Sequence, residues 1–373
     1  MVLCTFLLVS SRLGSLNALT QCRSGGIWRR YGICGALPSA DQLGRIAAVM
    51  PAREVRRQLK RIYRLLKRRK ALMPASHDNL YTLVIDGHES CASYRRTCGD
   101  CLTRRLNKGT PLERLQYYHR LVMGVLVCDR FTLLLDVEMQ RQGEGEVSAA
   151  CRLLDRLLSD YPRAFDIVLA DGLYAQGPFF KKVRRAGKHV IAVLKHKQRD
   201  LVEDVLKLCK RIDPRSLDTP DVKRQVWDLE QLTSWPQTGM AVRVVRSLET
   251  ATVKRQNGVI ETQTTQWMWV TTLSHRLLPA ERFIPIAHGR WRIENDAFNE
   301  LVTHWHADHV YKHSQNAILF FWLLTMLAYN LFHAFFFLNM KPQLRLCLQK
   351  YHVAACITAE LLAHDMPPRV RDP

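Results

Sequence analysis

Two short apolar runs, each ending in an aspartate, decide how this chain folds: Tyr81-Thr-Leu-Val-Ile-Asp86 and Ile167-Val-Leu-Ala-Asp171. Runs of four or five apolar or β-branched residues followed by turn residues are typical of buried strands. In sheets that contain parallel strands, ligands collect beyond the carboxyl ends of the strands. We therefore expect both aspartates at one functional edge of a sheet.

The segments around these runs alternate between strand and helix patterns. Strands are predicted at 119–128, 131–137 and 189–194, and helices at 146–159 and 177–186. The resulting order of three strands, helix, strand, helix and strand indicates an α/β fold, a mixed sheet with flanking helices. Polar and then strand-like sequence after Lys195 predicts a β-rich insertion, and helical patterns resume near Ala280.

The chain up to about residue 75 reads as helical. Ser39 and Gln42 form a capping box that starts one helix. Residues 1–11 are apolar but lack the basic start and the cleavage site of a secretory signal, so we interpret them as a helix fragment. A second helix has an apolar stripe formed by Val55, Leu59, Ile62 and Leu66.

The remaining surface of that second helix is crowded with cations. Acidic partners are nearly absent from it, so ion pairs within the helix cannot explain the charge. We interpret it as a phosphate-binding element of a DNA-binding region, with a solvated charged face as the alternative. The predicted DNA contacts are Arg57, Lys60, Arg61, Arg64 and Arg68.

The whole chain is strongly basic. Its 373 residues include 55 Lys and Arg against 34 Asp and Glu, which gives a net charge of +21. Such a surplus favours phosphate polyanions, so nucleic acid is the expected partner, ahead of an anionic membrane surface. Eleven cysteines, an odd number without a repeating spacing, suit reduced thiols, and we expect a cytoplasmic protein.

Three acidic residues stand out against this basic background: Asp86, Asp171 and Glu294. Displacement at a phosphodiester requires stabilisation of both the attacking and the leaving oxygen. Two Mg²⁺ or Mn²⁺ ions about 4 Å apart, held by carboxylates, provide it. We therefore predict that the three carboxylates are metal ligands, although a turn or cap role is the commoner alternative for a lone aspartate.

Three strings carry a resemblance to a known family. Residues 84–90 (VIDGHES), 168–174 (VLADGLY) and 289–301 (GRWRIENDAFNEL) resemble the signature regions of the DDE transposases of bacterial insertion sequences, in particular the insertion-sequence-four type. The resemblance covers roughly residues 80–335. It implies a ribonuclease H-like core with a β-rich insertion, and a helical N-terminal domain that binds terminal inverted repeats.

The resemblance also implies an activity. Asp86, Asp171 and Glu294 would be the catalytic carboxylates of metal-dependent cleavage at element ends and of strand transfer into target DNA, carried out by a homo-oligomer assembled on double-stranded DNA. A catalytically decayed or domesticated DNA-binding protein and a metal-dependent nuclease without strand transfer are the alternatives. The implied location is the nucleoid-associated bacterial cytoplasm.

The glutamate region departs from the family pattern at two places. Arg290 and Glu294 have the family spacing, but Ala287 replaces the usual Tyr, and Leu301 and Val302 occupy the positions of the usual Lys. We expect Arg290 to hold a phosphate near the scissile bond. Arg292 is a further predicted DNA contact.

Two tryptophans of the insertion, Trp267 and Trp269, are also candidate DNA contacts. The resemblance implies that a tryptophan there stacks on a flipped base, and such stacking contributes about 1–3 kcal/mol per base. Packing against a core is the commoner role of tryptophans in an alternating strand, and we favour it.

Two further patterns could bind metal. On helical spacing His306, His309 and His313 share one face, which predicts either a zinc site or a polar, DNA-facing surface. The Cys98-x-x-Cys101 pair has no second pair at zinc-finger spacing, and because structural zinc sites need four ligands, we do not predict a zinc site there.

The apolar stretch 317–340 is interrupted by Asn330 and His333, so a buried core helix is expected rather than a membrane span. The predicted units are a DNA-binding region (1–75), a catalytic core in two parts (78–196 and 274–340), the insertion (197–273) and a C-terminal tail (341–373).

Overall fold

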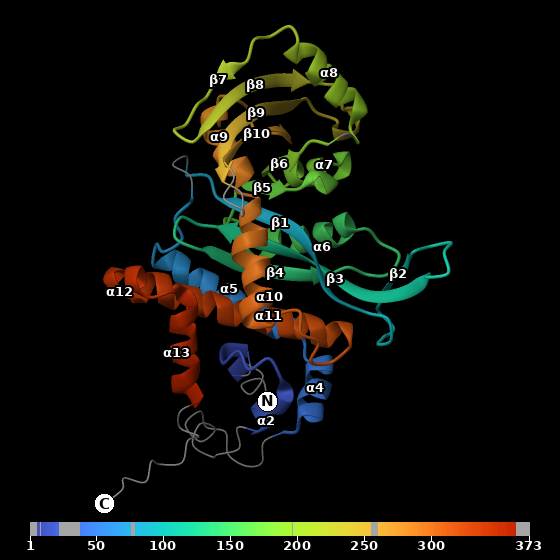
Figure 1. Ribbon diagram of the computed structural model, residues 1–373, viewed down its shortest axis with the longest axis vertical. Helices are drawn as coiled ribbons and strands as arrows, with labels where there is room; N and C mark the ends of the chain where they lie inside the picture. The colour runs from blue at the N-terminus through green and yellow to red at the C-terminus, as the bar shows by residue number, and fades with distance from the viewer. Residues whose placement is uncertain are drawn as a thin grey trace, which may run out of the picture.

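The computed structural model describes residues 6–7, 9–21, 38–75, 79–195, 197–254 and 260–362. Its strands form one ten-stranded mixed sheet that extends along the long axis of the molecule (Figure 1). The order is β2-β3-β1-β5-β6-β10-β9-β8-β7, and β4 pairs with β3. The strands are β1 (Thr82–Ser93), β2 (Leu102–Leu106), β3 (Arg114–Val127), β4 (Thr132–Met139), β5 (Ile167–Ala170), β6 (His189–Val193), β7 (Arg215–Ser216), β8 (Val222–Leu232), β9 (Val242–Lys254) and β10 (Ile260–Thr271).

Helices cover both faces of this sheet. They are α2 (Leu16–Gln21), α4 (Ala40–Val49), α5 (Ala52–Arg68), α6 (Glu146–Asp160), η1 (Gly172–Tyr174), α7 (Gly177–Arg185), α8 (Arg199–Cys209), η2 (Pro236–Thr238), α9 (Ala280–His288), η3 (Ile293–Phe298), α10 (Asn299–Trp305), α11 (Gln315–Ala334), η4 (Phe335–Asn339), α12 (Pro342–Cys347) and α13 (Lys350–Leu362). The mixed α/β class predicted from the sequence is therefore confirmed.

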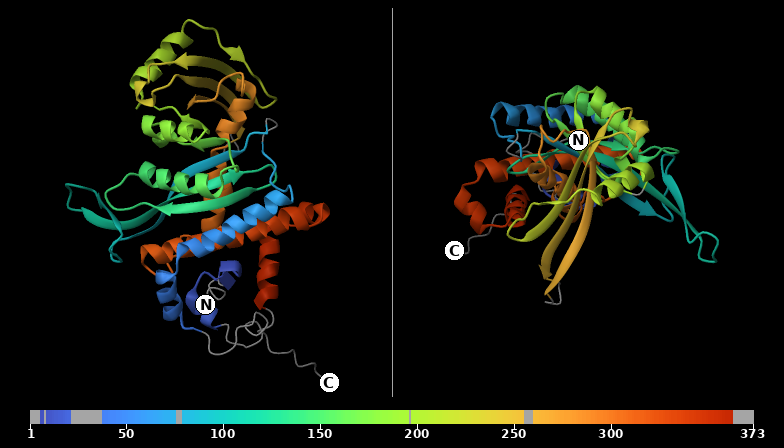
Figure 2. Two further views of the ribbon diagram at one scale, coloured as in Figure 1. Left: turned by 180° about the vertical axis from the view of Figure 1, so that it is seen from behind. Right: turned by 90° about the horizontal axis from the view of Figure 1, so that it is seen from above.

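The central strand β1 shows why helices pack on both sides. Successive side chains of a strand point to opposite faces. Leu83 and Ile85 lie in the hydrophobic cluster that contains the buried side of α6, whereas Val84 lies in the cluster that contains α9 and α11. In Figure 1, α9 and α10 cross in front of the sheet, and α6 and α7 lie on the opposite side, seen in Figure 2. Asp86 lies two residues after Val84, so its side chain points to the same face of the sheet, where it contacts Arg290 between α9 and η3.

The predicted helices and the strands β4, β5 and β6 are present within a few residues of their expected bounds, for example α6 at Glu146–Asp160. The first strand was expected to end at Asp86, but β1 continues to Ser93 because it pairs with β3 along this length, so Asp86 lies within the strand. β3 begins at Arg114, five residues before its expected start. β1 pairs with β3 in antiparallel and with β5 in parallel orientation, and β5 is parallel to β6. The sequence patterns did not predict β2, β7, β8 or α8, nor the helices α12 and α13 in the segment expected to be a tail.

The N-terminal helices pack directly on this core. The capping box predicted at the start of α4 is present, with Ser39 and Gln42 exchanging hydrogen bonds of 2.8 and 3.2 Å. The predicted apolar stripe of α5 is buried. It contacts α11 and β4, so α5 forms part of the wall around the sheet.

Helix α11 is a core element. The segment Gln315–Asn339 is the one helix of the described residues that is long and apolar enough to cross a membrane, but 72% of its most apolar window is buried inside the protein. Its polar side chains bond within the core: Asn330 accepts from Leu134 N and donates to Leu134 O at 3.0 and 2.8 Å. The prediction of a buried core helix is therefore confirmed.

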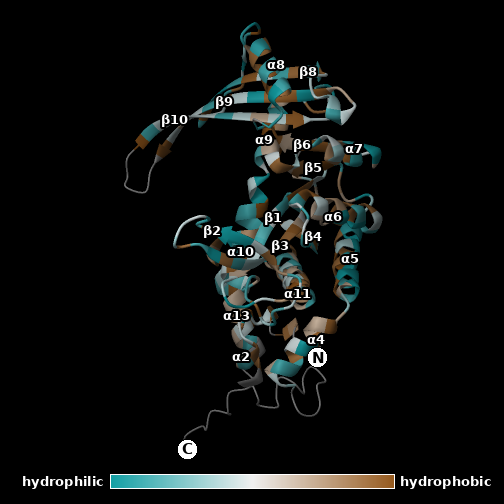
Figure 3. Ribbon diagram, turned by 90° about the vertical axis from the view of Figure 1, so that its right-hand side faces the viewer, coloured by the Kyte–Doolittle hydropathy of each residue, from teal (hydrophilic) through white to brown (hydrophobic). Residues whose placement is uncertain are grey.

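The predicted β-rich insertion continues the main sheet. β10 pairs with β6 through Trp269 and Val193, and β9 and β8 follow outward. The far end of the β9–β10 hairpin projects from the body of the protein (Figures 2 and 3). Residues 1–5 and 8 of the expected N-terminal helix fragment, and residues 363–373 of the tail, lie outside the described residues.

Candidate active site

Asp86 and Glu294 meet at one guanidinium nitrogen. Arg290 Nη1 lies 3.0 Å from Asp86 Oδ2 and 3.0 Å from Glu294 Oε1. The side chains of Arg290 and Asp86 are 11% and 14% exposed, whereas Glu294 is 41% exposed. Two carboxylates that are 208 residues apart in the chain therefore contact the same cation at the edge of the core.

Asp171 is placed beside Asp86 by strand register. Thr82, Leu83 and Val84 of β1 pair with Ile167, Val168 and Leu169 of β5. Continuing this parallel register by two residues sets Asp86 opposite Asp171, on strands about 4.8 Å apart. Asp171 follows β5 and caps η1, since its Oδ1 accepts from the N–H of Leu173 at 2.7 Å.

The electrostatics of Asp86 reflect a crowded acidic pocket. Burial raises its pKa to about 7, and the negative charges of Asp171 and Glu146 also act to raise it. Arg290 and the N–H of Gly87, which donates to Asp86 Oδ1 at 2.9 Å, oppose this rise. Burial is the largest cause, so a charged Asp86 is disfavoured in this acidic cluster despite its contact with Arg290.

Glu146 is a fourth acidic residue of this cluster, and the sequence analysis missed it. It begins α6, where an acidic residue is ordinarily explained by the helix dipole, so the sequence offers no distinguishing signal. Its buried carboxylate accepts from Tyr174 Oη at 2.8 Å and pairs with Arg120 at 3.5 Å. A Cβ at Gly87 would overlap this carboxylate, so the glycine permits the close approach.

A lysine also reaches the cluster. Lys195 follows β6, and its Nζ lies 3.7 Å from Asp171 Oδ2 while its side chain remains 60% exposed. Its methylene groups cover Gly172, where a Cβ would meet them at 2.7 Å. The sequence analysis did not single out Lys195, because its approach to Asp171 depends on the pairing of β5 with β6.

Glu294 lies in η3, a π-helical turn that precedes α10 without a break. Insertions of this kind shift the face that a helix presents and are frequent at functional sites. Arg292, just before η3, donates to Asp296 Oδ2 at 3.0 Å and to Cys128 O at 3.3 Å.

The predicted DNA contacts of α5 divide into two groups. Lys60 pairs with Asp160 of α6 at 2.5 Å and is 24% exposed, so its charge is already compensated. Arg61, Arg64 and Arg68 are exposed, as is Arg57, which pairs with Glu54 on the same helix at 3.1 Å. These four arginines line one shallow groove along the helix.

The two tryptophans differ in burial. Trp269 is 1% exposed and packs against Phe283 and His288, so it has the core role favoured from the sequence. Trp267 is half-buried and stacks on Trp269 with ring centroids 5.9 Å apart. Trp267 is thus the one of the pair with exposed ring surface.

The predicted helical face of histidines does not form. α10 ends at Trp305, and His306 adopts a left-handed conformation with φ of 52°, so the next residues follow a turn. His304 stacks on the ring of Tyr351, and His309 contacts Tyr311. His313 points to Cys101, with its Nε2 3.8 Å from Cys101 Sγ.

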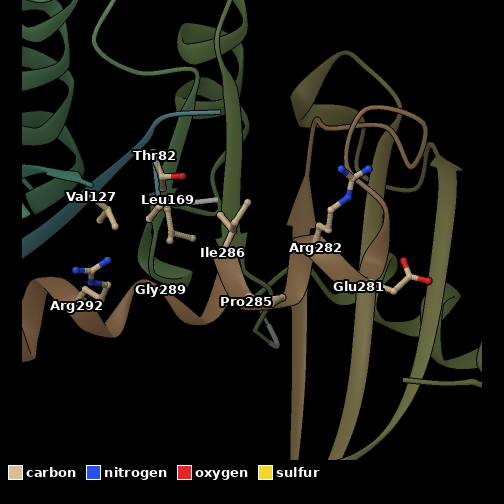
Figure 4. Close-up of a pocket in the computed structure, with 10 residues that line it drawn as sticks. Thr82, Val127, Leu169, Glu281, Arg282, Pro285, Ile286, Gly289 and Arg292 are labelled. Carbon is tan, nitrogen blue, oxygen red and sulfur yellow. The ribbon is translucent and has the colours of Figure 1, made fainter. Parts of the chain in front are cut away.

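A cavity of about 330 Å³ lies near the acidic cluster, and its lining includes Gly289, the neighbour of Arg290 (Figure 4). Its lining includes Thr82 at the start of β1, Leu169, and Pro285 and Ile286 of α9. Thr82 lies at the opposite end of the apolar run from Asp86. The cavity is mainly apolar, although Glu281, Arg282 and Arg292 also line it, and its lining does not include Asp86, Asp171, Glu146 or Glu294.

Comparison with known proteins identifies a family. No curated protein matches the chain significantly. Residues 108–331 match the family described as the transposase DDE domain, a span that includes Asp171 and Glu294 and begins beyond Asp86. Because this match covers more than half of the chain, the protein belongs to the family of DDE-domain transposases.

Proposed function

We propose that this chain is an insertion-sequence-four-type transposase that cleaves DNA at element ends and transfers the strand into target DNA. The observation that carries the proposal is the convergence of acidic residues: Asp86 and Glu294 contact Arg290 Nη1, and strand register sets Asp171 opposite Asp86. The order β4-β3-β1-β5-β6, antiparallel and then parallel, supports the ribonuclease H-like core that the resemblance implies.

Asp86, Asp171 and Glu294 would hold Mg²⁺ or Mn²⁺, most simply as two ions. The donor set fits, because carboxylate oxygens are the ligands that hard cations prefer. The raised pKa of Asp86, about 7, also fits, since a cation would offset the charge that burial disfavours. Such ions, when bound, activate the attacking oxygen and stabilise the leaving one.

Basic residues of the site would position the DNA strand. Arg290 orients Asp86 and Glu294, and its remaining N–H groups can donate to a phosphate. Lys195 places a largely exposed ammonium group beside Asp171. We assign to Lys195 the phosphate contact that the family's lysine would make, because Leu301 and Val302 at those positions cannot provide it.

The exposed arginines of α5 would contact the backbone of the terminal inverted repeats, and Arg292 would contact DNA nearer the site. Trp267 is the candidate for stacking on a base. Both ends of an element must be held during strand transfer, so we propose a homo-oligomer assembled on DNA in the bacterial cytoplasm.

The test uses labelled DNA that carries the inverted repeats flanking the gene, with Mn²⁺ and the full-length protein. We expect cleavage followed by joining to target DNA. Asp86→Asn, Asp171→Asn and Glu294→Gln should each abolish cleavage and retain DNA binding in a gel-shift assay. Asp296→Asn is the matched control, since this carboxylate on the same turn pairs with Arg292 and should leave cleavage intact.

The alternatives give different results in the same assay. DNA binding without cleavage would identify a decayed or domesticated DNA-binding protein, which the departures at Ala287 and Leu301 favour. Cleavage without joining would identify a nuclease. Full cleavage by any of the three carboxylate variants would refute the role of that residue.

A further inference from the structure

A second cluster of metal-binding side chains lies apart from the acidic site, and it assembles residues from three parts of the chain. Cys98 and Cys101 lie in the connection between β1 and β2, His119 lies on β3, and His313 precedes α11. The ligand atoms of Cys98, Cys101 and His313 all lie within 4.8 Å of one another. His119 Nε2 faces both sulfurs.

The sulfur–sulfur and sulfur–nitrogen distances match those around a tetrahedrally coordinated Zn²⁺ ion. Cys98 Sγ and Cys101 Sγ are 3.7 Å apart, and His119 Nε2 lies 3.3 and 3.4 Å from them. His313 Nε2 lies 3.8 Å from Cys101 Sγ. With Zn–S of about 2.3 Å and Zn–N of about 2.0–2.1 Å, tetrahedral geometry requires about 3.8 Å between sulfurs and about 3.5 Å between sulfur and nitrogen.

The buried ring of His119 lacks the hydrogen bonds that a histidine in a protein core usually makes. His119 is fully buried, and its Nδ1 has no hydrogen-bond partner among the described residues, so the polar contacts of this ring are those of Nε2 with the two sulfurs. A neutral imidazole has a lone pair available for a metal.

The Cys-x-x-Cys turn is held in place by backbone and side-chain hydrogen bonds. The N–H of Asp100 donates to Cys98 Sγ, and the N–H of Cys98 donates to Cys101 Sγ at 3.3 Å. The side chain of Gln142 donates to the carbonyls of Gly99 and Cys101 at 2.9 and 2.8 Å, which fixes the turn. Hydrogen bonds of this kind stabilise thiolate ligands.

We propose that Cys98, Cys101, His119 and His313 form a structural Zn²⁺ site with two sulfur and two nitrogen ligands. A closed site with four protein ligands has no open position for substrate, so its role is stability. The ion links the β1–β2 connection, which follows the Asp86 strand, to the segment that follows α10 and Glu294. The site thus ties together the two chain segments that deliver Asp86 and Glu294.

The test is the zinc content of the full-length protein, purified under reducing conditions from zinc-supplemented cells and measured by mass spectrometry. We expect about one zinc per chain in the wild type, and loss of stoichiometric zinc in Cys98→Ser and in His313→Asn. Cys151→Ser and His309→Asn are the matched controls, because both residues lie outside the cluster, and they should retain zinc.

A second measurement covers variants that fold poorly. Wild-type protein refilled with Co²⁺ should show the absorption bands of a tetrahedral site with thiolate ligands, and removal of the ion by a chelator should lower its thermal unfolding temperature. Zinc-free wild type that takes up neither Zn²⁺ nor Co²⁺ would overturn the proposal. A disulfide between Cys98 and Cys101 in protein kept under reducing conditions, or full zinc content in Cys98→Ser, would also overturn it.

Discussion

At the scale of single residues, Gly87 is the position where the backbone of β1 lies very close to the carboxylate of Glu146. A Cβ at this position would overlap the carboxylate of Glu146. Gly87→Ala should therefore force Glu146 away from Tyr174 Oη and lower the free energy of unfolding by about 1–3 kcal/mol, measured by urea denaturation. Gly99→Ala, whose Cβ meets no atom within 4 Å, is the control. Equal stability of the two variants would contradict this account.

Arg290 should have a stability effect that depends on metal. In Arg290→Gln, Asp86 and Glu294 lose the cation that they share. We expect the free energy of unfolding of the metal-free protein to fall by about 2 kcal/mol. This fall is smaller than is typical for a fully buried pair, because Glu294 is partly exposed. Added Mn²⁺ should shrink this loss, since ions held by the same carboxylates offset their repulsion.

Thermal unfolding with and without Mn²⁺ measures this effect of Arg290. The control is Arg292→Gln, which breaks an exposed pair with Asp296 and should show a small loss that Mn²⁺ does not change. A loss of thermal stability in Arg290→Gln that is the same with and without Mn²⁺ would argue against metal binding by Asp86 and Glu294.

The sequence alone was enough to nominate Asp86 and Asp171, because each ends an apolar strand run. It could not nominate Glu146 or His119. Glu146 looks like an ordinary first residue of a helix, and His119 looks like one polar residue in a strand. Their importance arises from contacts with residues that lie far away in the sequence.

At the scale of elements, helix α5 should contribute affinity for DNA through its exposed arginines. The double variant Arg61→Gln/Arg64→Gln should weaken binding and reduce the slope of log K against log salt concentration by about 0.9 for each phosphate that the helix no longer neutralises. The control is Arg56→Gln. Arg56 pairs with buried Asp136 at 2.8 Å, so this change should lower stability with little effect on the salt slope.

Fluorescence anisotropy at several salt concentrations measures the slope. An unchanged slope in the double variant would assign the arginines to a solvated charged face. The paired cations of α5 could not have been recognised from the sequence, because their acidic partners Asp136 and Asp160 belong to β4 and α6.

Helix boundaries were harder to predict than helix positions. The spacing of His306, His309 and His313 suggested a continuous helix, but α10 ends at Trp305 and the chain turns toward β3. The Cys98-x-x-Cys101 turn appeared incomplete as a metal site for the same reason. The two nitrogen ligands that this turn lacks come from His119 on β3 and from His313 after α10. No local sequence pattern connects these histidines with the two cysteines.

At the scale of the whole molecule, stability should fall as the solution is acidified. Burial lowers the pKa of a set of histidines below the ordinary 6.5, so below that pH the unfolded chain binds protons that the folded protein does not. These histidines are His88, His119, His189, His304, His309 and His333.

The free energy of unfolding should accordingly fall between about pH 7 and pH 5, measured from urea transitions. Asp86, whose pKa is raised to about 7, acts in the opposite direction over this range, and the histidines outnumber it. In His333→Gln the free energy of unfolding should depend less steeply on pH, because this change removes one of the buried histidines that become protonated only when the protein unfolds. Stability that rises toward pH 5 would show that these rings are protonated in the folded protein.

The mixed sheet with flanking helices could be predicted because the strands and helices of the catalytic region have strong local periodicity. The extent of the sheet could not be predicted from the sequence. The sequence separated a core from an insertion, whereas β10 bonds to β6 and joins both into one sheet. Such pairing between distant strands depends on long-range contacts rather than on local pattern.

This continuity has a mechanical consequence for the hairpin formed by β9 and β10. Its base is hydrogen-bonded to β6, which is the neighbour of β5, the strand that Asp171 follows. A force on the projecting arm is therefore transmitted through two rows of backbone hydrogen bonds and not through a loose tether. A molecule bound to the projecting end of the β9–β10 hairpin would therefore exert force on β6 and β5, the strands next to the acidic residues.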